Sequence, residues 1–176
     1  IGENSQSGAL YLSGANSSVY VAPGGANYRQ NIGDAAYGYF SIKDGSVVYR
    51  DGYVLLGRNG GRGFFVQESG TATFNLNTLW LARPNASSKS HGEYLLRGGT
   101  LNTPGGITFL NPDSGANFYN ASAILTVGGG TLAATVDTTS LYVYGSTNIV
   151  GKNETSFNLN EKGLLKCEQM RFVVPG

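Results

Sequence analysis

The stretch GFFVQESGTA at residues 63–72 decides the fold, because its pattern recurs along the chain. Each copy begins with glycine or alanine and has an aromatic residue or leucine at its third position. The other copies are GALYLSGA at 8–15, GYFSIKDGSV at 38–47, GEYLLRGGTL at 92–101 and AILTVGGGTL at 123–132. Apart from the first copy, each has a second glycine at its eighth position, namely Gly45, Gly70, Gly99 and Gly130. A repeat of about 20–50 residues predicts a solenoid or a related repeat architecture.

A second apolar stretch follows each of the last four copies at a similar interval. These stretches are YVLLG at 53–57, LWLA at 79–82, ITFL at 107–110 and LYVYG at 141–145. Within the first stretch of each unit, apolar residues alternate with a period of two, which indicates a β-strand rather than an amphipathic helix. Each unit is therefore predicted to contain a strand, a glycine turn, a strand, a short turn, a strand and a polar loop.

Units of this size bury their apolar residues only by stacking on one another, so equivalent positions are expected to form columns. One predicted core column contains Leu10, Phe40, Phe65, Tyr94 and Leu125, and another contains Leu12, Ile42, Gln67, Leu96 and Val127. Lys43, Glu68 and Arg97 share a position with alternating charge and are expected to form a ladder of ion pairs.

The predicted fold class is all-β, a parallel β-solenoid of about six coils with almost no helix. It is expected to be a single domain over residues 1–176, in which the repeats cover about 8–145 and residues 146–176 form a degenerate terminal coil.

The units combine glycine, an aromatic residue and a Gly-Thr pair with a following aliphatic strand, and they resemble the autotransporter-associated β-strand repeat. That repeat also occurs in large bacterial surface proteins, including those with a PEP-CTERM sorting signal. The closest stretches are FVQESGT at 65–71, YLLRGGTL at 94–101 and LTVGGGTLAAT at 125–135, the last of which is similar to the terminal unit of such arrays. The resemblance implies a right-handed parallel β-helix without a cofactor, secreted or held at a bacterial cell surface. It supplies no catalytic residues.

The composition argues against several classes of partner. Charged residues make up 13% of the chain, against about 25% in average globular proteins, and the formal net charge is +1. This charge gives no electrostatic footprint for nucleic acid. The apolar runs are far shorter than a membrane span requires. Cys167 is the single cysteine, so an internal disulfide is not available, and the spacing of a metal site is not found.

Catalytic chemistry is not expected from the sequence. His91 is the only histidine and lies in a polar stretch, where a solvated loop position is predicted, and Cys167 alternates like a buried strand residue. Glycoside hydrolysis needs two carboxyl groups about 5–10 Å apart, and the acidic residues do not recur at equivalent positions of the repeat. A polysaccharide-cleaving β-helix enzyme is therefore only the third hypothesis.

Glycan binding is the second hypothesis. Tyr39 and Phe64 fall in the register opposite the predicted core, and Arg58, Arg62 and Arg83 occupy successive loops on one edge. Aromatic faces beside arginines suit a sugar or an acidic glycan, so these five residues are the candidate ligand-binding residues of an adhesin module. The same outer face is also consistent with cover by another layer or subunit, or with bare exposure.

A structural role is the first hypothesis. A solenoid has an unpaired strand edge at each end, and neither end of the chain shows an amphipathic cap helix. We therefore expect self-association through these edges, or pairing with neighbouring segments of a longer parent chain. The sequence thus predicts a non-catalytic stalk, passenger segment or fibre subunit at the cell surface.

Overall fold

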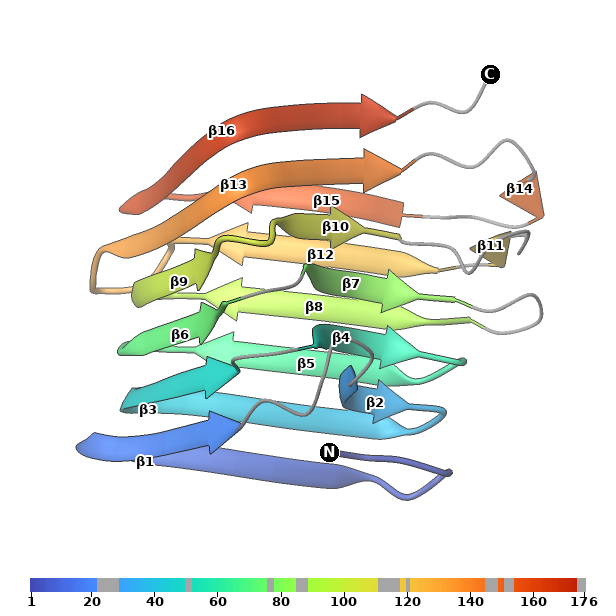
Figure 1. Cartoon of the computed structure of the whole chain (residues 1–176), viewed down its shortest axis with the longest axis horizontal. Helices are drawn as coiled ribbons and strands as arrows, with labels where there is room; N and C mark the ends of the chain where they lie inside the picture. The colour runs from blue at the N-terminus through green and yellow to red at the C-terminus, as the bar shows by residue number, and fades with distance from the viewer. Residues whose placement is uncertain are drawn as a thin grey trace.

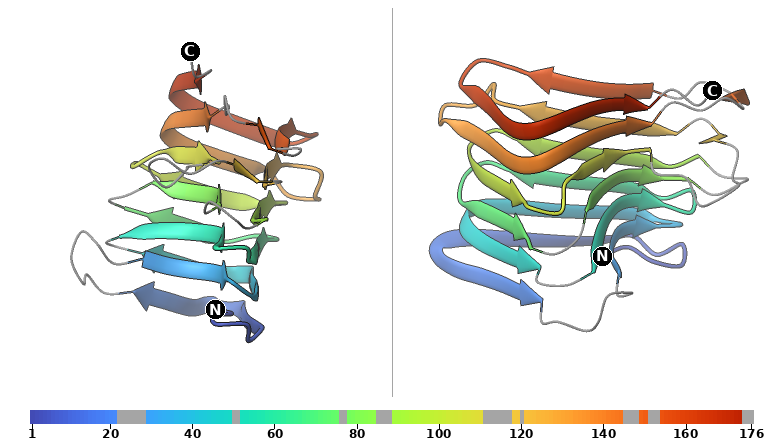
Figure 2. Two further views of the ribbon diagram at one scale, coloured as in Figure 1. Left: turned by 90° about the vertical axis from the view of Figure 1, so that its right-hand side faces the viewer. Right: turned by 45° about the horizontal axis from the view of Figure 1, so that its top comes forward.

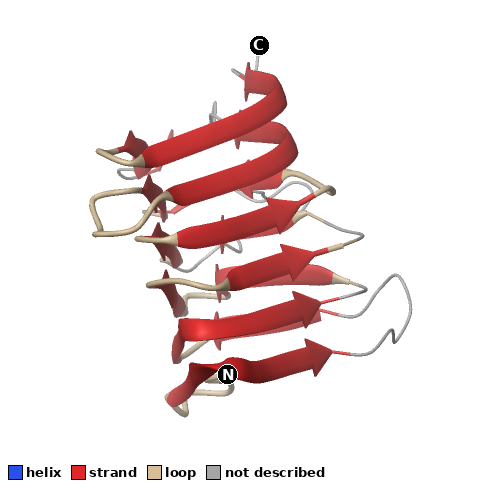
Figure 3. Ribbon diagram, turned by 90° about the vertical axis from the view of Figure 1, so that its left-hand side faces the viewer, coloured by secondary structure: helices blue, strands red, loops and turns tan. Residues whose placement is uncertain are grey.

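The computed structural model describes residues 1–21, 29–49, 52–75, 78–84, 89–110, 118–119, 121–144, 149–150 and 154–173. These ranges contain strands and no helix (Figures 1 and 3). The strands are β1 (Gly8–Val21), β2 (Arg29–Asp34), β3 (Tyr37–Tyr49), β4 (Tyr53–Arg58), β5 (Arg62–Gln67), β6 (Thr71–Phe74), β7 (Leu79–Arg83), β8 (His91–Leu96), β9 (Gly99–Thr103), β10 (Ile107–Phe109), β11 (Phe118–Tyr119), β12 (Ser122–Val127), β13 (Ala134–Tyr144), β14 (Ile149–Val150), β15 (Glu154–Leu159) and β16 (Gly163–Val173).

The strands form a right-handed β-solenoid with three faces, whose coils are stacked from the N-terminal to the C-terminal end (Figures 1 and 2). The first face contains the N-terminal halves of β1 and β3, then β5, β8, β12 and β15. The second contains the C-terminal halves of β1 and β3, then β6, β9 and the N-terminal halves of β13 and β16. The third contains β2, β4, β7, β10 and the C-terminal halves of β13 and β16. Every pairing is parallel, and right-handed crossovers are the rule for parallel strands.

The stack has about four turns with a neighbour on both sides, which begin at β3, β5, β8 and β12, whereas the sequence predicts about six coils. The difference concerns the two terminal coils. The first coil contains β1 and β2, and the last coil contains β15 and β16. Within the described residues, each of them has a neighbouring coil on one side only. The C-terminal tail therefore continues the stack, since β15 pairs with β12 and β16 pairs with β13.

The predicted core columns are confirmed. Phe40, Phe65, Tyr94 and Leu125 are neighbours in register along the first face, and all four are fully buried. The aromatic rings of this column stack, with centroids 4.7 Å apart for Phe40 and Phe65 and 4.6 Å apart for Phe65 and Tyr94. Ring contacts of this kind add to the stabilisation that comes from burying the apolar area.

Gln67 is a polar residue in the second core column and is fully buried. Its Nε2 donates hydrogen bonds to the backbone oxygens of Gly70 at 2.9 Å and Thr100 at 3.1 Å, and its Oε1 accepts one from the Tyr94 hydroxyl at 2.6 Å. Burial of an amide costs several kcal/mol unless it is hydrogen-bonded, roughly 2–7 kcal/mol by transfer data. These partners therefore make a glutamine compatible with an otherwise apolar column.

The glycines that begin two central repeats allow the close approach of two faces. A Cβ at Gly63 would lie 2.1 Å from the backbone oxygen of Ile32, and one at Gly92 would lie 2.3 Å from that of Leu56. The third-face strands turn at this corner through residues with positive φ, such as Gly57 at +71° and Ala82 at +57°. Glycine adopts this conformation without a steric penalty, which suits Gly57 to its position.

The prediction that Gly130 occupies the repeat-glycine corner of its coil is wrong. Gly45, Gly70 and Gly99 stack at the corner between the first and second faces, but the residue opposite Gly99 on β13 is Ala134 rather than Gly130. Residues 128–133 form a longer corner in this coil, whereas residues 97–98 suffice in the coil before it. The register of β13 thus begins four residues later than the sequence alignment predicts.

The predicted charge ladder is present in part. Arg97 Nη1 lies 3.0 Å from Glu68 Oε1, and both side chains are about half exposed. Lys43 makes no ion pair within the described ranges. Exposed pairs such as Arg97–Glu68 contribute about 0–1 kcal/mol, so the ladder is a minor part of the stability.

Candidate functional site

A column of polar and aromatic residues lies on the outer side of the first face. Tyr37, Arg62, His91 and Ser122 are neighbours in register on β3, β5, β8 and β12. Each precedes the glycine or alanine that begins a repeat, so its side chain points away from the core. Adjacent strands are about 4.8 Å apart, so the stacking brings together side chains that are distant in sequence.

A pocket of about 330 Å³ lies along this column. Its lining consists of Arg62, Phe64, Lys89, Ser90, His91 and Ser122. The half-buried Phe64 ring forms one wall and is flanked by two rings, Tyr37 with its centroid 5.2 Å away and His91 with its centroid 5.0 Å away. The pocket therefore combines an aromatic surface with hydroxyl and cationic groups.

His91 begins β8 and is half-buried, so the prediction of a solvated loop histidine is wrong. Its Nδ1 is hydrogen-bonded to the Ser122 hydroxyl, and its Nε2 lies 3.4 Å from Glu93 Oε2. Both ring nitrogens therefore have a polar neighbour, which holds the imidazole in place beside Phe64.

The two cations of the pocket, Arg62 and Lys89, are both exposed. Neither forms an ion pair with any residue in the described part of the chain. None of the described lining residues is a carboxylate, since Glu93 lies beside His91 but outside the lining. The lining therefore carries excess positive charge, while two acidic residues, Glu93 on β8 and Glu154 on β15, lie beside it.

Of the five predicted ligand-binding residues, the structure brings Arg62 and Phe64 together in this pocket. Tyr39 is the neighbour of Phe64 in register, on the outer side as predicted. It lies one coil away from the pocket, and its ring faces Tyr11 with centroids 5.6 Å apart. Tyr39 therefore extends the aromatic surface without lining the pocket.

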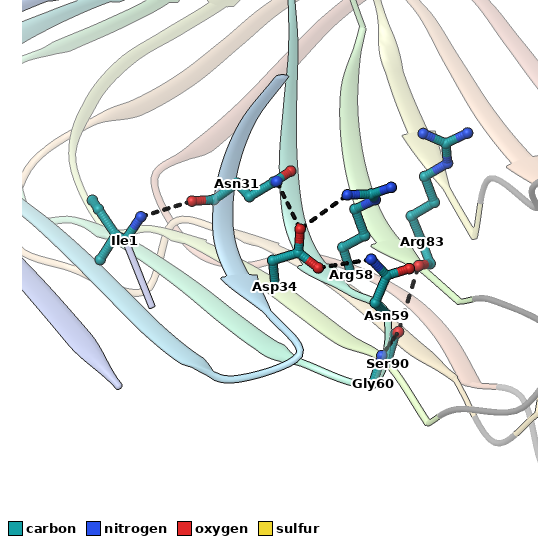
Figure 4. A network of polar contacts seen from close by, with 8 residues as sticks. All are labelled: Ile1, Asn31, Asp34, Arg58, Asn59, Gly60, Arg83 and Ser90. Carbon is teal, nitrogen blue, oxygen red and sulfur yellow. Dashed lines mark hydrogen bonds and ion pairs between the residues drawn. The ribbon is translucent and has the colours of Figure 1, made fainter. Parts of the chain in front are cut away.

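Arg58 and Arg83 do not join this pocket. Arg58 ends β4, and its Nη1 donates a hydrogen bond to Asp34 Oδ2 at 2.9 Å (Figure 4). The buried Asp34 also accepts hydrogen bonds from Asn31 Nδ2 and Asn59 Nδ2, each at 2.8 Å. Because a buried carboxylate is costly without partners, this network gives Arg58 a structural role in joining two coils.

Arg83 ends β7 as the neighbour of Arg58 in register, and it is buried. Its guanidinium carbon lies 4.5 Å from the centre of the Trp80 ring, which in turn stacks on Tyr53 with centroids 4.2 Å apart. The Arg83 carbonyl accepts a hydrogen bond from Ser90, whose hydroxyl also accepts one from the backbone nitrogen of Gly60 (Figure 4). Arg83 therefore belongs to the structural corner rather than to an open surface.

The sequence reasoning missed His91, Lys89 and Ser122 as site residues. The signal for two of them was present in the repeat alignment. His91 and Ser122 each stand one position before the first residue of a copy, as Arg62 does, so the alignment that places Gly92 and Ala123 also places them.

A second and larger hollow, of about 700 Å³, follows the second face near the C-terminal end. Asn102, Asp137 and Lys166 are neighbours in register along it, and Glu168 and Pro104 also line it. It therefore brings Asp137 and Glu168 into one groove, which the repeat alignment did not predict. The described lining of the groove contains no aromatic side chain, and its last wall belongs to β16.

Core columns are uncovered at both ends of the stack, except on the third face of the N-terminal coil, where residues 1–3 pair with β2 and Ile32 is buried. At the N-terminal end Leu10 is 36% exposed, although Phe40 next to it in the column is fully buried. At the C-terminal end Phe172 is 71% exposed, Leu159 is 52% exposed and Met170 is 45% exposed. Their column neighbours one coil inward are far less exposed, and Val127 and Leu141 are buried. The exposure follows from the position of these residues, because no described strand pairs with the outer edge of their strands.

The backbone edges at the two ends are also open. Within the described residues, the first-face half of β1 pairs only with β3, β15 pairs only with β12, and β16 pairs only with β13. An open edge of a parallel sheet presents unpaired N–H and C=O groups that another strand can bind. Each end of the solenoid thus combines an apolar surface with hydrogen-bonding capacity.

Among the described residues, no three His, Cys, Asp or Glu side chains gather as metal ligands would. The same part of the chain contains no apolar helix of the length that a membrane span needs. A comparison of the chain with protein-family models, curated proteins and solved structures finds no significant match.

Proposed function

We propose that this chain is a non-catalytic structural solenoid that extends by stacking end to end with further copies of itself. The observation that carries the proposal is the exposure of first-face core residues at both ends, Leu10 at one and Leu159 at the other. A stacked copy covers these side chains and pairs the open edges of β1, β15 and β16. Such a joint combines apolar burial with backbone hydrogen bonds.

The two ends have matching core columns, which favours a second copy as the occupant. In a head-to-tail joint the first-face strand of β1 continues the column after β15, so that Leu10 follows Phe157 and Leu12 follows Leu159. On the second face Val19 follows Leu165 in the same way. Every contact of this set joins two apolar side chains. Because the two surfaces differ, the association is heterologous and leads to an open filament.

The corner lengths at the two ends are also compatible. The corner between the first and second faces comprises residues 13–16 in the first coil and 160–162 in the last one. Inside the stack the corresponding corner ranges from a shorter one at residues 43–44 to a longer one at residues 128–133. A copy of the first coil placed on the last coil therefore meets a corner of similar size.

The proposal places this solenoid outside the cell, as a stalk, passenger segment or fibre subunit of a bacterial surface protein. The resemblance of its units to the autotransporter-associated β-strand repeat supports this setting. The low share of charged residues and the single cysteine are compatible with it.

The test compares two exposed aromatic residues of the terminal coils. Phe172→Lys places a charge on the core column at the joint, whereas Tyr11→Lys changes a side chain of similar exposure, 72%, on the outer side of the first face. Electron microscopy and sedimentation velocity over a concentration series measure the assembly of both variants and of the unchanged protein. Circular dichroism confirms that each variant retains its β-structure.

We expect filaments from the unchanged protein and from Tyr11→Lys, and monomers from Phe172→Lys. A folded, unchanged protein that remains monomeric at its highest soluble concentration contradicts the proposal, because the ends would then not recognise a second copy. Assembly that Phe172→Lys leaves unchanged also contradicts it, since the joint would not involve the exposed core.

A further inference from the structure

We propose that the pocket of Arg62, Phe64, Lys89, His91 and Ser122 binds one acidic sugar residue of a polysaccharide, through a carboxylate or a sulfate ester. This inference concerns the flank of the solenoid and goes beyond the structural function proposed above. It rests on three features of the pocket, namely the charge of its cations, its aromatic wall and its size.

The charge of the lining selects an anion. Arg62 has a planar guanidinium that pairs two N–H groups with the oxygens of a carboxylate or sulfate, and Lys89 supplies a second, mobile cation. Neither is neutralised by an acid within the described residues. Ser122 lies next to the His91 nitrogen in the same column and provides a hydroxyl at the far side of the pocket.

The aromatic wall selects a ligand with an apolar face. The Phe64 ring is half-buried and held by Tyr37 and His91, whose centroids lie 5.2 and 5.0 Å from it. The face of an aromatic ring is electron-rich, so it attracts the weakly positive C–H groups that line one side of a pyranose. Inorganic anions have no such face, and Phe64 would add nothing to their binding.

Glu93 favours a ligand that has hydroxyl groups close to its acidic group. Its carboxylate lies 3.4 Å from His91 Nε2 and is about one-third exposed, just outside the lining. A carboxylate there accepts hydrogen bonds from hydroxyl groups and repels a second anionic group. The pocket is thus suited to a ring that carries one acidic substituent among several hydroxyls.

The charge of the whole chain argues against nucleic acid as the alternative ligand, and the size of the pocket suits a small group. The net charge is +1, without the extended basic surface that nucleic acids require. The volume of about 330 Å³ lies at the lower end of the range for small-ligand pockets, about 300–1,000 Å³. The pocket accommodates a small part of a glycan, while the remaining sugar residues lie across the open outer face of the protein.

The experiment titrates the full chain with three defined probes and inorganic sulfate, using isothermal calorimetry or NMR. The probes are digalacturonic acid for the carboxylate, a disaccharide with one sulfate ester, and the uncharged disaccharide of the same linkage. The variants are Arg62→Gln in the pocket and Arg97→Gln as a matched control, because Arg97 is an exposed arginine near the other end of the first face that pairs with Glu68. A third variant, Phe64→Val, tests the aromatic wall.

We expect at least one acidic disaccharide to bind, the uncharged one to bind at least about 10-fold more weakly, and Arg62→Gln to weaken the acidic one by about 10-fold, which is 1.4 kcal/mol. Arg97→Gln should leave the affinity unchanged. The preferred acidic probe tells whether the natural ligand is carboxylated or sulfated. Each of these results should be independent of assembly, since Arg62→Gln leaves the ends of the stack intact.

Three results overturn the proposal. The first is equal affinity for the charged and uncharged disaccharides, and the second is an Arg62→Gln variant that binds as well as the unchanged protein. The third is inorganic sulfate that binds as tightly as the sulfated disaccharide and is insensitive to Phe64→Val. That result would identify a simple anion site without sugar recognition. The unfolding midpoint of every variant is measured first, so that a loss of binding is not confused with a loss of structure.

Discussion

Phe109 and Phe172 occupy the same core column of the third face, two coils apart, and their surroundings differ completely. Phe109 lies between Leu81 and Val143 and is fully buried. Phe172 follows Val143 in the last coil and is largely exposed. The amino acid and its position in the repeat are the same, so the burial of a side chain in this protein depends on the coil beyond it. Stability in a solenoid is accordingly a property of the contacts between neighbouring coils.

The largest expected effect tests this comparison directly. Phe109→Ala should lower the free energy of unfolding by about 3–5 kcal/mol, because it leaves a cavity between two coils. Phe172→Ala should change it by less than about 0.5 kcal/mol in the monomer, as is usual for exposed positions. Urea unfolding at a concentration where the protein is monomeric measures both values, since assembly would add to the apparent stability. Similar losses for the two variants would mean that the terminal column is covered within the monomer.

A medium effect is expected for two tyrosine hydroxyls that each reach a glutamine on a neighbouring coil. The buried Tyr94 hydroxyl donates to Gln67 Oε1 at 2.6 Å, whereas the Tyr142 hydroxyl donates to Gln169 Oε1 at 3.3 Å at an exposed site near the C-terminal end. Tyr94→Phe should lower the free energy of unfolding by about 1–3 kcal/mol, because a buried acceptor loses its partner. Tyr142→Phe should have an effect within about 0.5 kcal/mol. Thermal unfolding of both variants provides the comparison, and equal effects would show that burial does not decide the strength of these contacts.

The smallest effect is expected for the ion pair between Glu68 and Arg97. A double-mutant cycle with Glu68→Gln and Arg97→Gln should give a coupling energy of about 0.2–1 kcal/mol that decreases with added salt. Lys43→Gln serves as the control for the unpaired member of the predicted ladder and should show no coupling to Glu68. A salt-independent coupling above this range would indicate that the outer surface of the coils is less hydrated than its exposure suggests.

Much of the fold was predictable because two patterns select the same buried positions. One is the alternation of apolar residues along a strand, and the other is the alignment of the repeats. Phe65 and Gln67 stand two positions apart on one strand, and aligning the repeats places both in core columns, which the structure confirms. The position of the fourth corner was not predictable in this way. Gly130-Thr131-Leu132 and Ala134-Thr135-Val136 both satisfy the pattern, and only the pairing of β13 with β9 across coils selects the second.

The candidate site was predicted less well, because an arginine near a strand end does not reveal its partner. Arg58 is paired with Asp34, which belongs to the previous coil, and Arg83 covers Trp80 on its own strand. Both contacts depend on side-chain direction at a corner with positive φ, which composition and spacing do not specify. Arg62 and Phe64 could be placed correctly since they lie inside a regular strand, where alternation determines the outer side.

The contact between Gln67 and Tyr94 also limits where repeats could be added to or removed from this protein. Repeats of similar length could in principle be duplicated or deleted one at a time, since most column neighbours are apolar and interchangeable. A unit inserted between β5 and β8 would separate the glutamine from the tyrosine and leave its amide oxygen buried without that donor. An insertion between β8 and β12 would place apolar core residues such as Leu96 and Val127 against new apolar neighbours, although it would separate His91 from Ser122 on the outer side. In the core of the first face, an insertion at the first junction therefore breaks a buried polar pair that the second junction lacks.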